Sequence, residues 1–401
     1  MEESVFPAPF RPLVLPLLAA SLGCGLAACG GVGPASTPPD AIYATTVSGS
    51  ILTFPITDSW LQAASLGTPT SVAGPANSQG LAIVPLSAVQ YALYVSDPVS
   101  NAIRVYSINQ SSNQPSPAGI GPFPLGSGEG SPQAMVSGYP LASAWLYVAT
   151  SKDTIAGFSI GTDGALTPVS GSPFAAGAGL FQLIVTQTLA KPPAEPAVCL
   201  YASDHADSNG GVSAFAVQGN GALAPVAGSP FATVAGGGPT AFVSTTLATA
   251  SGATQVLYVG LGNASAIAGF AIAPDCSLSP LAGSPFPAGN GVASLFSGDL
   301  TLFAANSTDG TVSSFTIDQA AGALTPLATT PLTGVGGSGS ALNANGLIFL
   351  PNPSTDSFLG LQFSGSTLGS AGIAPLPASP FYAGSGTLAL AFLFRPVFDP
   401  P

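Results

Sequence analysis

Charged side chains are scarce in this chain. They make up 5% of its 401 residues, and 17 acidic residues against five basic ones give a formal net charge of −12. After position 40 the basic residues are Arg104, Lys152, Lys191 and Arg395. Because so few cations cannot neutralise a nucleic-acid backbone or an anionic membrane surface, we expect neither as a partner of the body of the chain.

Cysteine is rare as well, with four residues, at positions 24, 29, 199 and 276. No pair has the C-x-x-C spacing of a structural zinc site, so we expect no zinc. For Cys199 and Cys276 we expect two buried thiols. A disulfide between them is the alternative in an oxidising compartment.

Hydrophobic residues, by contrast, make up 46% of the chain, which also has 50 glycines and 40 prolines. This composition allows a large core and favours short strands and turns. Seven alternating segments with a large apolar residue near the centre recur at intervals of 45 to 57 residues. The central residues are Phe54, Tyr106, Phe158, Phe215, Phe270, Phe315 and Leu361. A repeat of this period indicates one array of similar units.

A second strand-like run precedes each of these segments, as in LYVSD, LYVAT and LYASD. Each segment is followed by a line such as ALTPVSGSPF at 165–174, or a weaker form of it, and then usually by another apolar run. Units of four antiparallel strands predict an all-β, seven-bladed propeller over residues 41–395. The first unit lacks an inner strand, and we expect the C-terminal run TLALAFLF at 387–394 to supply it and close the ring.

The Pro-Phe line is predicted to form the outer strand of a blade and the crossover to the next. Proline cannot donate a hydrogen bond to a neighbouring strand, so it is typical of an edge. The phenylalanines of this line are expected to pack between blades. They are Phe174, Phe231, Phe286 and Phe381.

The N-terminal part of the chain is different in character. Residues 12–28 form an uncharged apolar run, and LAAC at 26–29 resembles the bacterial lipobox. The resemblance implies a lipoprotein signal peptide over residues 1–29, lipidation of Cys29 and a flexible tether over 30–40. An uncleaved anchor helix and cleavage without lipid remain alternatives. We therefore expect an exported, membrane-anchored protein of the cell envelope, periplasmic or on the cell surface, with a short tail at 396–401.

The repeats LYVSD…IRVYSI and GFSIGTDGALTPVSGSPF resemble those of the seven-bladed lactonase-like propellers. This family includes bacterial 6-phosphogluconolactonases and fungal muconate cycloisomerases. The resemblance covers about residues 41–395 and implies the propeller fold. It also implies a channel mouth with histidine, carboxylate and arginine groups, which this chain largely lacks. Arg104, for example, falls in the third strand of its blade, away from the channel.

Candidate catalytic residues are predicted on the face that carries the loops between strands two and three. Glu129, Lys152, Asp204 and His205 fall on one sector of this rim. His205 is the single histidine, and an imidazole can act as a general base near neutral pH. Asp204, Asp207 and Asn209 are also considered as oxygen ligands of calcium. Ordinary turn chemistry explains the same residues, and no other cofactor is expected.

From the scarcity of acid–base groups we expect a binding or interaction module for a small molecule or an envelope protein. The alternative is a lactone or ester hydrolase of the lactonase-like family, with His205 and its neighbours at the site. A third possibility is a structural repeat protein of the cell surface.

Overall fold

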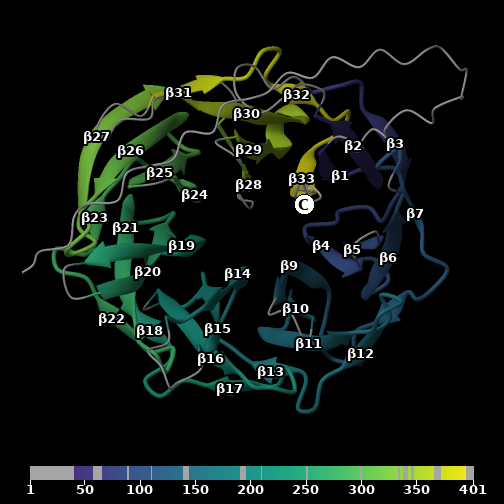
Figure 1. The fold of residues 1–401 in the computed structure, drawn as a ribbon, viewed down its shortest axis with the longest axis horizontal. Coiled ribbons are helices and arrows are strands. Elements are labelled where there is room, and N and C mark those ends of the chain that lie inside the picture. The colour runs from purple at the N-terminus through teal and green to yellow at the C-terminus, as the bar shows by residue number, and fades with distance from the viewer. Residues whose placement is uncertain are drawn as a thin grey trace, which may run out of the picture. The chain divides into compact units, whose positions relative to one another are not determined.

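The computed structural model describes residues 40–56, 66–87, 90–109, 111–138, 144–189, 196–208, 210–249, 252–298, 300–332, 335–336, 342–344, 347–364 and 372–393. Its sheets form a ring of seven blades around a central channel (Figure 1). Each blade contains four antiparallel strands, which in blades 2 to 7 follow chain order from the channel outward, while in blade 1 the C-terminal strand is innermost, so the predicted fold is confirmed.

The four positions within a blade repeat from blade 1 to blade 7. The inner strands are β33 (Thr387–Leu393), β4 (Leu81–Ser87), β9 (Pro132–Gly138), β14 (Leu180–Gln187), β19 (Pro239–Thr249), β24 (Val292–Gly298) and β28 (Leu342–Ala344). The second strands are β1 (Ala41–Thr46), β5 (Gln90–Asp97), β10 (Trp145–Thr150), β15 (Val198–Asp204), β20 (Gly252–Leu261), β25 (Thr301–Asn306) and β29 (Leu347–Asn352).

The third strands are β2 (Ser50–Pro55), β6 (Ala102–Ile108), β11 (Thr154–Ile160), β16 (Gly211–Val217), β21 (Ala266–Ile272), β26 (Thr311–Ile317) and β30 (Ser357–Ser364). The outer strands are β3 (Thr70–Ala73), β7 (Pro115–Pro117), β12 (Leu166–Pro168), β17 (Leu223–Pro225), β22 (Leu278–Pro280), β27 (Leu324–Pro331) and β31 (Gly372–Pro375). A single 3-10 turn, η1 (Pro353–Thr355), is the one helical element of the described chain.

Ring closure follows the predicted scheme. The C-terminal strand β33 pairs with β1, and the register runs from Ala41 opposite Leu393 to Thr46 opposite Thr387. Each inner strand also contacts the inner strands of both neighbouring blades. The predicted central residues of the third strands are all buried, so the repeat that the sequence shows is the repeat of the core.

The Pro-Phe line has a more detailed role than the sequence suggests. Its Leu-Thr-Pro part forms an outer strand in blade 3, and Phe174 then returns in the short strand β13 (Phe174–Ala175) to pair with β11. The same short strands occur as β8 (Phe123–Pro124), β18 (Phe231–Ala232), β23 (Phe286–Pro287) and β32 (Phe381–Tyr382). Phe174 packs between blades 3 and 4, against a cluster that includes Tyr147 and Leu183, as predicted.

The serine of the Gly-Ser-Pro-Phe sequence stabilises the third strand. The Ser172 Oγ accepts a hydrogen bond from the Gly157 backbone N–H at 3.0 Å. The same contact recurs three more times, where the hydroxyl oxygens of Ser229, Ser284 and Ser379 accept from the backbone N–H groups of Ala214, Gly269 and Gly360. A backbone donor that the interrupted outer strand leaves unpaired is thereby satisfied.

Neighbouring blades are joined by tyrosines of the second strand. The Tyr147 hydroxyl donates to the Gly221 carbonyl of the next blade at 2.9 Å. Equivalent bonds run from Tyr43, Tyr94, Tyr201 and Tyr258. Phe303 and Phe349 take this position in blades 6 and 7, so those junctions lack the hydroxyl.

The expectation of two buried thiols is wrong. Cys199 and Cys276 form a disulfide with a Cα–Cα distance of 5.5 Å. Cys199 lies in β15 of blade 4, and Cys276 lies in the turn of blade 5 whose carbonyl accepts the Tyr201 bond at 3.0 Å. Two residues 77 positions apart are adjacent because the repeat places the second strand of one blade against the outer turn of the next.

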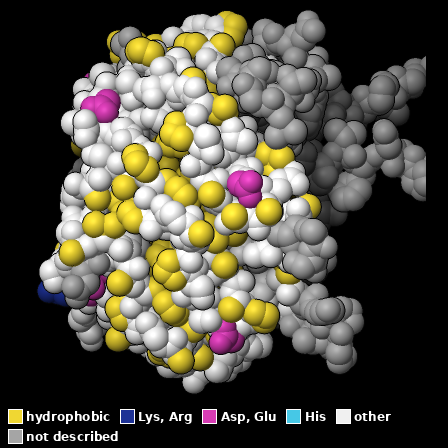
Figure 2. Space-filling view, turned by 90° about the vertical axis from the view of Figure 1, so that its left-hand side faces the viewer, with side chains coloured by type: hydrophobic (Ala, Val, Ile, Leu, Met, Phe, Trp, Pro, Cys, Tyr) yellow, Lys and Arg dark blue, Asp and Glu magenta, His cyan; other side chains and the backbone are white. Residues whose placement is uncertain are grey.

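Charge is as sparse on the structure as in the sequence. On the side that carries β23 and β27, Figure 2 shows isolated charged side chains among hydrophobic and uncharged polar ones. The prolines of the outer strands are exposed there, including Pro280 and Pro326.

Candidate functional site

The candidate site lies at one end of the channel, where the inner strands begin. Register shifts occur at the start of β9, β14, β19, β24 and β33. In β14, for example, Leu180 is opposite Asp204 and Leu183 is opposite Ala202, which leaves Phe181 and Gln182 in the bulge. Bulges redirect side chains and are frequent beside functional sites.

A cavity of about 470 Å³ occupies this end of the channel. It is lined by five blades, through residues 79–81 at the start of β4, 133–136 of β9, 180–183 of β14, 240 of β19 and 388–390 of β33. None of these described lining residues is charged. A concave site with apolar walls and a few polar groups is the usual form of a small-molecule site.

Gln182 is a polar group with a defined orientation. Its Oε1 accepts a hydrogen bond from the Phe242 backbone N–H of blade 5 at 2.8 Å. Because that bond holds the oxygen, the amide nitrogen is the end that can donate to a ligand. The Thr240 hydroxyl, in contrast, is directed at two backbone carbonyls, of Val292 at 2.5 Å and of Gly260 at 3.1 Å.

His205 lies at the rim of the cavity and not in its lining. The ring of Phe181, which lines the cavity and is 37% exposed, lies with its centroid 5.5 Å from that of His205. The His205 Nδ1 is 3.2 Å from the Pro239 carbonyl oxygen. A carbonyl only accepts, so Nδ1 is the donor in this bond, and in the neutral ring Nε2 is then the acceptor.

Asp204 is adjacent to His205 in the sequence but has a different environment. It is fully buried, and its Oδ2 accepts a hydrogen bond from the Ser213 hydroxyl at 3.0 Å. Its Oδ1 has no hydrogen-bond partner in the described chain. Burial raises the pKa of Asp204 to about 6, and the negative charges of Asp207 and Asp153 act in the same direction, while the Ser213 bond lowers it.

In other blades, the residue at the position of Asp204 has a structural role. It ends the second strand, and a Cβ on Gly177 of the preceding linker would lie 2.0 Å from its Cγ. In blade 6, Asn306 has the same place, opposite Thr311, and a Cβ on Gly289 would lie 2.5 Å from its Cγ. The Asn306 amide donates to Ser313 at 2.9 Å, as Ser213 contacts Asp204.

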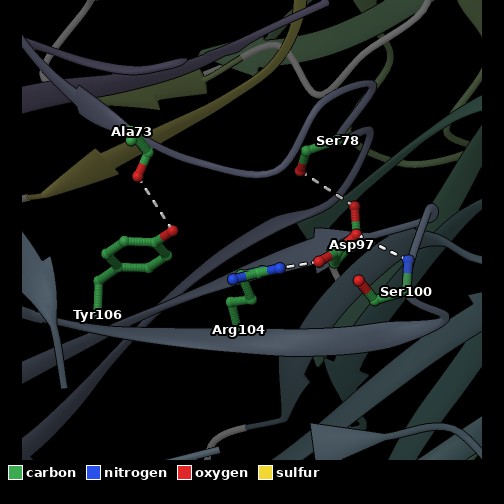
Figure 3. A network of polar contacts seen from close by, with 7 residues as sticks. Ala73, Ser78, Asp97, Ser100, Arg104 and Tyr106 are labelled. Carbon is green, nitrogen blue, oxygen red and sulfur yellow. Dashed lines mark hydrogen bonds and ion pairs between the residues drawn. The ribbon is translucent and has the colours of Figure 1, made fainter. Parts of the chain in front are cut away.

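Asp97 is the equivalent residue of blade 2 and shows what a cation changes (Figure 3). Its Oδ2 lies 2.7 Å from the Nε of Arg104, the single ion pair among the described residues. Burial raises the pKa of Asp97, but hydrogen bonds from Ser100 and Arg104 outweigh it and bring the pKa below its ordinary value. Arg104 belongs to the third strand and lies away from the channel, as predicted.

Glu129 and Lys152 lie in two adjacent segments, which are joined where the Ser151 N–H donates to the Ser131 carbonyl at 3.0 Å. Glu129 lies in the linker before β9, and its Oε2 is buried without a hydrogen-bond partner in the described chain. Lys152 is exposed, and a Cβ on Gly130 would lie 2.9 Å from its Cγ. No hydrogen bond or ion pair links any two of the described candidates Glu129, Lys152, Asp204 and His205.

The remaining predicted residues are only partly described. Asp207 lies in the loop after β15, with its backbone N–H bonded to the Asp204 carbonyl at 3.2 Å. Asn209 and Cys29 lie outside the described residues, so the calcium and lipidation predictions stay predictions. Within the described ranges, no group of three or more His, Cys, Asp or Glu side chains is arranged to hold a metal. The described part of the chain also contains no helix with the length and hydropathy of a transmembrane segment.

The cavity lining itself escaped the sequence reasoning. Gln79, Gln133 and Gln182 carry no charge and belong to no recognisable motif. The available signal was positional, because each precedes or opens an inner strand that follows a crossover. The residues at this position, compared from blade to blade, place the three glutamine amides on one rim.

Comparisons with known proteins agree with this architecture. The periplasmic gluconolactonase of Pseudomonas aeruginosa is 16% identical, with a TM-score of 0.66 over 89% of this chain and 99% of that chain. A Bacteroides uniformis protein provisionally named a 6-phosphogluconolactonase is 13% identical, with a TM-score of 0.64 over 88% and 99%. This chain has the fold of the seven-bladed lactonase-like propellers. No family model matches its sequence, and no curated protein matches it either.

Proposed function

We propose that this propeller binds a small uncharged molecule at the mouth of its central channel. The observation that carries the proposal is the cavity of about 470 Å³, whose described lining combines three glutamines with apolar side chains and contains no charged group. Gln182 offers oriented amide donors, and the exposed ring of Phe181 offers an apolar surface beside them. These groups suit a ligand with hydroxyl or carbonyl oxygens and an apolar part.

The electrostatics of the mouth disfavour a phosphorylated ligand. Phosphate recognition depends on arginine, lysine or backbone amides at a helix N-terminus, and the described cavity lining provides none of these. At the adjacent rim, acidic Asp153, Asp204 and Asp207 outnumber the exposed cation Lys152. A sugar phosphate would therefore lose its hydration without gaining an opposite charge.

A direct test compares neutral and anionic forms of one ligand by calorimetry, for instance gluconolactone against 6-phosphogluconolactone, together with other neutral sugars and their alkyl glycosides. Neutral ligands are expected to bind more tightly. The variant Gln182→Glu retains an oxygen for the Phe242 N–H but replaces the amide donor with a negative charge. It should therefore weaken the binding of neutral ligands at least tenfold. Gln90→Glu, on an exposed position of β5, is the matched control. Tighter binding of the phosphorylated form would refute the proposal.

A lactone or ester hydrolase is the second candidate, and the state of His205 favours it. Its Nδ1–H is held by the Pro239 carbonyl, which leaves Nε2 able to accept a proton from water near the cavity. The lactonase structures of the same fold support this candidate by analogy alone. A lactonase and esterase panel with the wild type and His205→Ala decides it: turnover lost in the variant supports the hydrolase, and absence of turnover in both leaves the binding function.

We also propose that the protein is exported and held at the cell envelope through lipid on Cys29, with the propeller as its folded body. The lipobox-like sequence supports this, and so does the Cys199–Cys276 disulfide, because disulfides persist in oxidising compartments. Cys29→Ser should move the protein from the membrane fraction to the soluble one. An unchanged distribution would contradict the anchor.

A further inference from the structure

The cavity changes in character along the channel. Gln79 precedes β4, while Gln133 and Gln182 lie at the second and third positions of β9 and β14, so all three amides belong to the mouth. Val136 lies three residues further along β9 than Gln133, and because the bulge lies between them the strand advances by about two residues of β10, or roughly 7 Å. The cavity therefore has a polar opening and a deeper part with a different lining.

The deeper part is apolar and incompletely covered. Met135 and Val136 of β9 line it, and both side chains are only half-buried. Leu81 of β4 has the same depth as Met135, because it is opposite Val95 as Met135 is opposite Val148, and it is half-buried as well. Apolar surface of this kind gains free energy when a ligand removes it from water. A ligand that contacted only the amides at the mouth would leave this apolar surface exposed to water.

We propose that the cavity takes an uncharged single-chain amphiphile, with a hydroxyl- or amide-bearing head at the three glutamines and an alkyl chain along Leu81, Met135 and Val136. The inference rests on the proposed binding function and specifies its ligand class. The polar head makes hydrogen bonds at the mouth, and the chain covers the apolar wall below it.

The charge distribution selects the uncharged form of such a ligand. A fatty acid or alkyl sulfate would bring its anionic head to a mouth whose described lining has no cation. The nearby acidic groups Glu129, Asp153 and Asp207 would repel it further. An alkyl glycoside or a similar neutral head avoids both costs.

The test is a homologous series on the wild-type protein. Butyl, hexyl and octyl β-glucosides, below their critical micelle concentrations, are titrated by calorimetry against glucose, octanoate and octyl sulfate. Each added methylene that enters the cavity is expected to lower Kd about fourfold, equivalent to about 0.8 kcal/mol. Octanoate and octyl sulfate should bind more weakly than octyl glucoside.

Variants separate the two parts of the site. Met135→Ser and Leu81→Ser should weaken the binding of octyl glucoside several-fold more than that of butyl glucoside. The Gln133 side chain makes no protein hydrogen bond in the described chain, and Gln133→Ala should weaken the binding of every glucoside by a similar factor. Val99→Ser, at a position 74% exposed in a loop of blade 2 and outside the cavity lining, is the control and should change nothing.

The outcomes distinguish this inference from the function on which it rests. Kd values that do not depend on chain length would overturn the amphiphile, while binding of the neutral heads alone would still support the channel as a site. Tighter binding of octyl sulfate than of octyl glucoside would also overturn it. No binding of any neutral probe would overturn both. Because the series uses the wild type, a variant that fails to fold leaves these outcomes unaffected.

Discussion

The buried carboxyl of Asp204 makes the stability of the protein depend on pH in an unusual direction. Its pKa rises from an ordinary 3.8 to about 6, chiefly because burial disfavours the charged form. A raised pKa means that the folded state binds the proton more tightly than the unfolded state. The contribution of Asp204 to stability is therefore complete below about pH 4 and is lost as the pH rises through about 6.

The size of this effect follows from the shift. One pKa unit corresponds to about 1.4 kcal/mol, so a shift of this extent amounts to about 3 kcal/mol in the free energy of unfolding. Asp204→Asn removes the charge and keeps the shape, as Asn306 does at the same place in blade 6. The difference in stability between the variant and the wild type should therefore grow by about 3 kcal/mol from pH 3 to pH 7.

Urea unfolding of both proteins, followed by tryptophan fluorescence at intervals of half a pH unit, measures this difference. Subtracting the two free energies of unfolding at each pH cancels the contributions of the other titrating groups. Asp309→Asn is a control of opposite sign, because hydrogen bonds from Asn290 lower the pKa of Asp309, so its stabilising contribution is lost on acidification. A difference between Asp204→Asn and the wild type that stays constant over this range would refute the reasoning.

Two further predictions concern the junctions between blades. Tyr147→Phe leaves the Gly221 carbonyl without its 2.9 Å partner and should lower the free energy of unfolding by about 1 to 2 kcal/mol in urea titrations, whereas Tyr382→Phe, at a ring 74% exposed, should change it by less than about 0.5. Removal of the disulfide, which closes a separation of 77 residues, should cost about 4 kcal/mol. The double variant Cys199→Ala/Cys276→Gly should have a higher melting temperature than the double variant Cys199→Ala/Cys276→Ala. The reason is that Cys276 has a φ of 68°, which glycine adopts without strain. Equal melting temperatures for the two double variants would contradict that argument.

The sequence by itself determined the repeat, the number of blades and the closure by the C-terminal strand. Strand periodicity and turn residues are local properties, and seven copies of one pattern reinforce each other, so the pattern alone assigns Phe158 and Phe215 to the core. The role of the Pro-Phe line as an outer strand followed from the missing N–H of proline. The sequence also showed that charge is too scarce for a phosphate-binding site.

Only the tertiary structure decided which distant residues meet. Cys199 and Cys276 were expected to be separate thiols, and their pairing depends on how one blade packs on the next. Gln133 and Gln182 come from different blades, and no local signal relates them until the ring closes and the bulges turn both toward the channel. A repeat pattern specifies each blade from neighbouring residues in the chain, whereas a site at the axis is built from single residues of several blades, and so its chemistry appears only when the ring is complete.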